Sequence, residues 1–305
     1  MADAPTAGSS SGDVQKALEE FTMADASNAG SSPGDVQKAL EEYRKTVLAS
    51  NQASLTWLVR RLEAMQPSEP MDDEEINERK LEVLQNYLGI DPEPEGLPDL
   101  IQRPGDALEH MDSLTRIAGL DGVILLDEGA TGSRDERIAH YLDVFNRALN
   151  EHAVKEFQGR LSVPAEFRTM MQQVDAVLGA GLPCYRDLFQ IAFYGGNSFP
   201  PDGGVNERVL QLEGDTDANY VLCLDDDWEV AAGWITGSGL PGDCYALYCR
   251  SVREGLDWAW RYHVGARDQT NFEPTADLAA FLTLYARYEE PNERDLEDAE
   301  GAPFA

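Results

Sequence analysis

The sequence predicts an α+β fold, in which a helical N-terminal half precedes a C-terminal antiparallel sheet covered by helices. Apolar residues recur at helical spacing from Ser32 onwards, whereas beyond Pro183 this periodicity fades and β-forming residues gather. Runs of helices followed by runs of strands, without strict alternation, are typical of α+β proteins. Short connections such as Asp225–Asp227 also favour hairpins over the crossovers that parallel strands need.

The chain divides by composition into four segments. We expect a disordered, duplicated N-terminus at residues 1–31, a helical region at 32–158, an α+β domain at 159–290 and an acidic, solvated tail at 291–305.

The N-terminal duplication joins Met1–Phe21 to Met23–Tyr43, which are identical at 17 of 21 positions. Solenoid repeats drift in sequence and need about three copies for stability. Two nearly identical copies indicate a recent tandem duplication or an alternative start at Met23, and the sequence alone assigns them no function.

Helix signals follow in order along the first half. Ser32 can cap a helix that carries an apolar stripe, the acidic run Asp72–Glu75 opens a second helix ending before Gly89, and a third runs from Asp106 to Ala118. The stripe of the first helix consists of Val36, Leu40, Tyr43, Val47, Leu55, Leu58, Val59 and Leu62.

Two further helices precede the strands. A capping box at Ser133–Glu136 opens one of them, and the other follows Pro164 and stops at Gly179. The short apolar run Gly122–Asp127 fits either a strand or a buried turn of helix.

The strands come late in the chain. Tyr220–Leu224 is apolar on both alternating faces, as in a central strand, and the run after Trp228, Cys244–Cys249 and Trp258–Val264 are further strand candidates. An amphipathic helix after Pro274 completes the pattern.

Composition excludes several classes of function. The chain has 24 Lys and Arg against 56 Asp and Glu, a net charge of −32, so a basic stripe for nucleic acid or anionic lipid is missing. Four cysteines are too few for a disulfide scaffold in 305 residues. Without a secretory signal or an apolar span, we expect a cytoplasmic or nuclear protein.

Motifs for chemistry are weak. Gly237–Gly242 matches Gly-x-Gly-x-x-Gly but leads into a strand-like run, which favours a hairpin loop over a nucleotide site. Cys244 and Cys249 would point to opposite faces of one strand, and His263 falls on a polar face, where a surface histidine is the simpler reading. We expect no cofactor and no metal.

Asp225–Asp227 is the most concentrated polar feature of the C-terminal half. Three successive carboxylates favour a hairpin turn, but they also fit a protein-contact surface or a Mg²⁺ or Ca²⁺ site. Nearby aromatic residues favour a packed sheet face, of which some rings near Trp228 and Trp234 could stay exposed as anchors.

The C-terminal half resembles the SUKH superfamily, which includes fungal cell-wall-assembly regulators and bacterial immunity proteins. The resemblance rests on the Pro-initiated helix Val163–Arg168, the loop Tyr194–Asn197, Gly233-Trp234, the step Gly242-Asp243 and the terminal helix Asp277–Leu282. It covers roughly residues 160–290 and departs where Gly-Gly-Asn replaces the usual Asn-Gly-Gly. It implies an α+β binding module that grips other proteins.

We therefore expect a non-enzymatic, acidic, regulatory module that binds a protein with a basic surface. The expected contact residues are Asp225, Asp226, Asp227, Trp228 and Trp234, with the net charge steering the partner. One alternative is a metal-dependent hydrolase that uses Asp225–Asp227 or Asp127-Glu128. Another is a scaffold whose helices at 32–150 pair with a second chain.

Overall fold

The computed structural model describes residues 31–66, 70–91, 97, 99–125, 134–194, 208–212, 219, 222–266 and 269–298. Its helices lie mainly in the N-terminal half and a four-stranded antiparallel sheet lies in the C-terminal part, so the predicted α+β class is confirmed. Residues 1–30 and the pair Asp127-Glu128 lie outside the described residues.

The first described helix, α2, runs unbroken over 32 residues from Pro33 to Ala64. Ser32 caps it: the Ser32 hydroxyl accepts from the backbone N–H of Asp35, and the Asp35 carboxylate accepts from the backbone N–H of Ser32. The predicted apolar stripe is confirmed, because all eight of its residues are buried.

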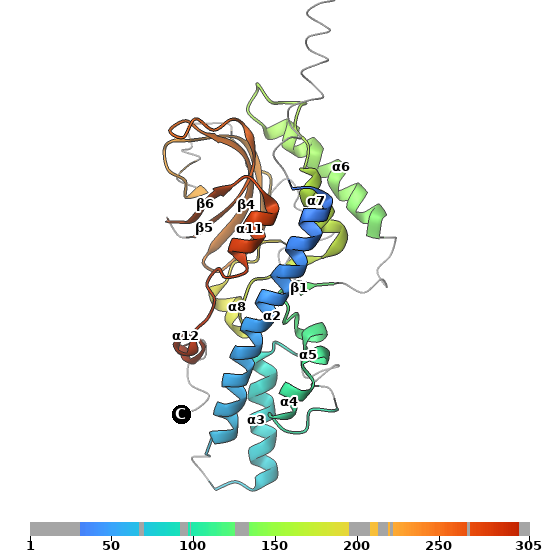
Figure 1. The fold of residues 1–305 in the computed structure, drawn as a ribbon, viewed down its shortest axis with the longest axis vertical. Helices are drawn as coiled ribbons and strands as arrows, with labels where there is room; N and C mark the ends of the chain where they lie inside the picture. The colour runs from blue at the N-terminus through green and yellow to red at the C-terminus, as the bar shows by residue number, and fades with distance from the viewer. Residues whose placement is uncertain are drawn as a thin grey trace, which may run out of the picture.

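Helix α2 lies in the middle of the molecule (Figure 1). Its N-terminal half packs against α7 (Ala165–Gln173) and α11 (Leu278–Tyr285), which lies between α2 and the sheet. Its C-terminal half packs against α3 (Asp73–Tyr87) and α4 (Asp106–Glu109). One apolar core therefore includes residues from both 32–158 and 159–290, and the division between these segments stays a prediction.

The helix ends follow their expected signals in part. Asp72 caps α3, and Gly89 and Gly119 adopt left-handed backbone angles (φ +58° at each) just after α3 and α5 (Met111–Ala118). The single helix predicted from Asp106 to Ala118 is wrong, because the backbone at His110 (φ −113°, ψ 29°) separates α4 from α5.

A small two-stranded sheet corrects another helix boundary. β1 (Val123–Ile124) pairs antiparallel with β2 (Ala176–Val177), which settles the open alternatives at Gly122–Asp127 in favour of a strand for these two residues. The helix after Pro164 ends at Gln173 and not at Gly179, because Val177 exchanges backbone hydrogen bonds with Tyr194. Helix α6 (Arg134–His152) precedes this region, and α8 (Pro183–Phe189) follows it.

The main sheet is an antiparallel meander in the order β3-β4-β5-β6. Its strands are β3 (Trp228–Gly239), β4 (Gly242–Ser251), β5 (Ala259–Ala266) and β6 (Gln269–Thr275). The strand expected at Tyr220–Leu224 is wrong for its described residues: Leu222–Leu224 form no strand, and Leu222 and Leu224 pack on the outer face of the sheet. Their apolar pattern reflects this packing.

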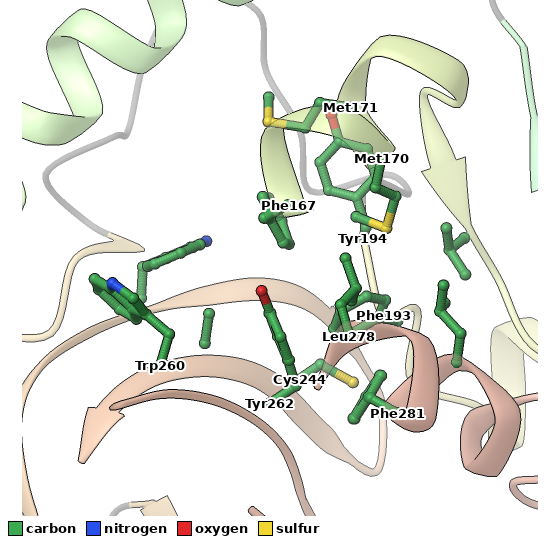
Figure 2. Packing of buried hydrophobic residues seen from close by; sticks show 14 of the residues in the cluster. Phe167, Met170, Met171, Phe193, Tyr194, Cys244, Trp260, Tyr262, Leu278 and Phe281 are labelled. Atoms are coloured by element: carbon green, nitrogen blue, oxygen red, sulfur yellow. The ribbon is translucent and has the colours of Figure 1, made fainter. Parts of the chain in front are cut away.

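The inner face of the sheet carries the aromatic core that the helices cover (Figure 2). Phe167 of α7 lies 5.3 Å from Trp234 and 5.5 Å from Tyr194, measured between ring centroids. Edge-to-face rings at this spacing stabilise a core beyond simple area burial.

The outer face of the sheet is covered as well. Leu222, Leu224 and Trp228 form a second cluster with Tyr245, Leu247 and Cys249. Cys244 belongs to the inner cluster and Cys249 to the outer one, which confirms that they point to opposite faces.

The predicted solvated tail is wrong at its start. Residues Glu293–Asp298 form the short helix α12, which packs on α2, and Leu296 is buried there. Residues 299–305 lie outside the described part of the chain.

The hydroxyl of Tyr43 anchors α2 to the rest of the core. Its Oη accepts a hydrogen bond from the backbone N–H of Gly179 (2.7 Å), and its ring stacks on Tyr285 at 6.2 Å. One helical position further, Arg44 forms an ion pair with Asp121 (2.7 Å). These contacts fix the position of α2 along its own axis.

We predict that Tyr43→Phe lowers the free energy of unfolding by about 1–3 kcal/mol, because it leaves the buried N–H of Gly179 without an acceptor. Urea unfolding followed by circular dichroism measures this loss. The matched control is Tyr185→Phe, since the Glu289 carbonyl that Tyr185 donates to also accepts from Gln190. An equal loss of stability in the two variants would contradict the stabilising role given to the Tyr43–Gly179 hydrogen bond.

Candidate functional site

A groove of about 800 Å³ runs along the solvent side of α2. Its lining comes from α2 and from the start of α12, and it comprises Ala49, Gln52, Ala53, Thr56, Trp57, Arg60, Arg61, Ala64 and Glu293. These α2 residues recur every three or four positions, so they share the face turned away from the buried stripe. The groove is open to solvent and is nearer to a flat surface than to an enclosed cavity.

Trp57 gives the groove its largest apolar surface. Its side chain is half-buried and packs partly on Tyr185 and Leu296, so α12 holds it in place from one side. The guanidinium of Arg61 lies 5.7 Å from the centre of the Trp57 ring, which is a cation–π distance.

The charge of the groove differs from that of the whole chain. Arg60 and Arg61 are exposed neighbours on α2, opposite a single acidic lining residue, Glu293. The chain as a whole carries a net charge of −32. The groove therefore combines a floor of small side chains with a local pair of cations.

The predicted turn lies at the edge of the sheet. Asp225 and Asp226 are exposed, and Asp227 is half-buried, where its Oδ2 accepts from the hydroxyl of Ser251 (3.1 Å) and pairs with Arg253 (3.4 Å). The segment is a turn into β3, but not a hairpin between two strands, because Leu222–Leu224 is no strand.

The expectation that Trp228 and Trp234 are exposed anchors is wrong. Trp228 is 4% exposed and donates its indole N–H to Glu273 (3.3 Å), while the guanidinium of Arg261 covers its ring at 5.5 Å. Trp234 is 2% exposed and contacts the rings of Phe145, Phe167 and Trp260 in the inner core.

Other candidate motifs serve the fold. His263 is fully buried, so the surface reading is wrong, and its Nε2 donates to the carbonyl of Leu222 (2.8 Å). The Gly237–Gly242 run forms the tip of the β3–β4 hairpin, as expected, and a side chain at Gly237 or Gly239 would collide with backbone of residues 190–193. Among the described residues, no group of three or more His, Cys, Asp or Glu could hold a metal ion.

Glu166 is a buried carboxylate with an altered pKa, a combination often found in active sites. Burial raises the pKa of Glu166, against the hydrogen bonds from Tyr262 (2.8 Å) and from the backbone N–H groups of Ser31 and Leu278, which lower it. Its partners come from the start of α2, from β5 and from α11. We interpret Glu166 as a structural residue whose hydrogen bonds join these three elements. It does not line the groove.

Sequence reasoning missed the groove. The signal was a second, weaker periodicity on α2: Ala49, Ala53 and Ala64 with a basic pair at Arg60-Arg61 in an acidic chain. Alanine carries little hydrophobic contrast, so the deeper stripe on the opposite face dominated the pattern.

No protein-family model, curated protein or solved structure matches this chain. The resemblance to the SUKH superfamily therefore stays a prediction. None of the described helices has the length and apolar character needed to cross a bilayer.

We predict that Trp234→Ala costs about 3–5 kcal/mol of unfolding free energy, as expected for an aromatic ring removed from a packed core. Asp226→Asn, at the exposed turn, should stay within about 0.5 kcal/mol of the parent protein. Chemical denaturation of the two variants tests this contrast. A near-neutral Trp234→Ala would contradict the assignment of Trp234 to the core and would restore it as a candidate contact residue.

The raised pKa of Glu166 makes the stability of the fold depend on pH. Because the pKa of Glu166 is raised above its ordinary 4.5, the folded protein keeps this proton after the unfolded chain has released it. Stability contributed by Glu166 is therefore full below pH 4.5 and is lost as pH rises through the raised pKa. The free energy of unfolding, measured against pH, should fall in the parent relative to Glu166→Gln over that window. Parallel curves for the two proteins would refute the prediction.

Proposed function

We propose that this chain is a non-enzymatic protein-binding module whose groove along α2 accepts an amphipathic helix of a partner protein. The observation that supports this function is the groove itself, with its small side chains, Trp57 at its wall and cations at one end. Helices commonly bind partners by laying an apolar face into such a groove. By analogy alone, the SUKH resemblance favours the same class of function.

The lining indicates the chemistry of the partner helix. Ala49 and Ala53 allow close approach of a second helix, whose aliphatic side chains at i, i+4 and i+7 would fill the hollow. Half-buried aromatic rings such as Trp57 are typical anchors of binding energy. Acidic side chains on the partner helix would pair with Arg60 and Arg61.

The acidic turn supports a weaker, second contact. Asp225 and Asp226 expose their carboxylates to solvent, where a basic partner surface can pair with them. Trp228 and Trp234 are buried and add no contact to this surface. Exposed ion pairs contribute only about 0–1 kcal/mol each. We therefore assign affinity mainly to the groove, and steering of basic surfaces to the net charge and the turn.

Two synthetic peptides test this function at about 0.15 M salt, where charges beyond roughly 8 Å are screened. Both are amphipathic helices with one leucine stripe, and their polar faces carry glutamate in one and lysine in the other. We predict that Ala53→Asp weakens binding of the glutamate peptide at least tenfold in fluorescence-polarisation titrations of the full chain.

Gln37→Asp is the matched control, since it adds the same charge at an exposed α2 position outside the groove. It should leave the affinity for the glutamate peptide unchanged. Any affinity for the lysine peptide should fall on replacing Asp225 and Asp226 by Asn, and not on Ala53→Asp. A glutamate peptide that binds but ignores Ala53→Asp would overturn the proposed function.

A further inference from the structure

We propose that the groove also binds the chain's own segment Gly12–Phe21, so that the N-terminal duplicate is an intramolecular ligand that competes with a partner helix. This inference rests on the groove assigned under the proposed function. It follows from what the described copy of the same sequence does in the fold.

The described copy shows the behaviour of this sequence. Gly34–Tyr43 matches Gly12–Phe21 at nine of ten positions, and it forms the first turns of α2. There Val36, Leu40 and Tyr43 are 0–2% exposed, so the sequence is suited to a helix that buries one apolar stripe. The upstream copy carries Val, Leu and Phe at the equivalent positions, which is the kind of stripe proposed above for a helix bound in the groove.

The upstream copy is a poor substitute for α2 in the core. Phe21 stands where Tyr43 is found, and it lacks the hydroxyl that accepts from the backbone N–H of Gly179. Thr22 stands where Arg44 pairs with Asp121. The core therefore selects the downstream copy, and the upstream stripe needs a different apolar surface.

The groove lies within reach of that stripe. At 1.5 Å per residue, Ala49 at the near end of the groove lies about 24 Å along α2 from Pro33, and Ser31 lies two residues before Pro33. The chain between Phe21 and Ser31 spans up to about 33–36 Å when extended. A segment that reaches down α2 in this way runs antiparallel to it, with Asp13 towards the Arg60-Arg61 end.

Charge favours binding within one chain over binding between two. The segment holds Asp13, Lys16, Glu19 and Glu20, which complements the cations of the groove. Two whole chains, each of net charge −32, repel one another. A covalent tether also keeps the segment close to the groove of its own chain, whereas a second chain must be bound from solution.

Photo-crosslinking in the full chain tests the proposal. Gln52, at the groove, is replaced by the photoreactive residue benzoylphenylalanine, and crosslinked peptides are mapped by mass spectrometry. We predict crosslinks to residues 12–21 of the same chain, with a yield independent of protein concentration. Val14→Asp with Leu18→Asp should reduce that yield at least tenfold. The control pair Gln15→Asp with Lys16→Gln changes the net charge equally on the polar face of the segment and should leave the yield unchanged.

The outcomes separate the two proposals. A crosslink that joins two chains, or one that survives Val14→Asp with Leu18→Asp, overturns the intramolecular ligand. The glutamate peptide provides the second measurement. It should bind the Val14→Asp, Leu18→Asp chain at least fivefold more tightly than the parent chain. Equal binding to the two chains refutes only the further inference, whereas no binding to either refutes the proposed function as well.

Discussion

The fold depends on burial of one stripe along α2. Its first four residues (Val36, Leu40, Tyr43 and Val47) belong to the core shared with α7, α11 and the sheet, and its last four (Leu55, Leu58, Val59 and Leu62) belong to the cluster with α3 and α5. Each fully buried aliphatic side chain contributes about 1.5–3 kcal/mol. Because one rigid helix joins the two clusters, a shift of α2 along its axis would disturb both, and the Tyr43–Gly179 hydrogen bond opposes such a shift.

Local signals account for what the sequence could predict. Caps at Ser32 and Asp72, the α2 stripe and the β3–β4 hairpin depend on residues within a few positions of one another, and they were found where expected. Whether a sheet face is covered depends on distant residues. Arg261 and His263 alternate like a solvated face, yet both are buried. Arg261 lies over the ring of Trp228, and the carbonyl of Leu222 accepts the His263 hydrogen bond. The strand predicted at Tyr220–Leu224 is wrong for a similar reason, because Leu222 and Leu224 pack on the outer face of the sheet and form no strand.

The residues of the candidate site were also hard to predict from the sequence. Trp228 and Trp234 were expected to contact a partner, but large rings contribute most when buried, and the fold uses both in cores. The groove depends on residues with weak signals, since Ala49 and Ala53 matter by leaving space and Arg60 by its position beside that space. Sequence pattern and composition indicate which side chains prefer to be buried, whereas a groove forms where the side chains are too small to fill the space.

The duplicate shows how a few atoms can give one sequence two environments. An unmade hydrogen bond to a buried N–H costs about 1–3 kcal/mol, which favours Tyr43 over Phe21 beside Gly179 by a factor of about 5–150. Arg44 adds an ion pair to a largely buried Asp121 that threonine cannot form. A helix bound in the groove needs no tyrosine hydroxyl at this position, because the groove is lined mainly by small side chains, one indole ring and two cations. A stripe that the core rejects for want of polar contacts is therefore still suited to the surface of the helix that the core retains.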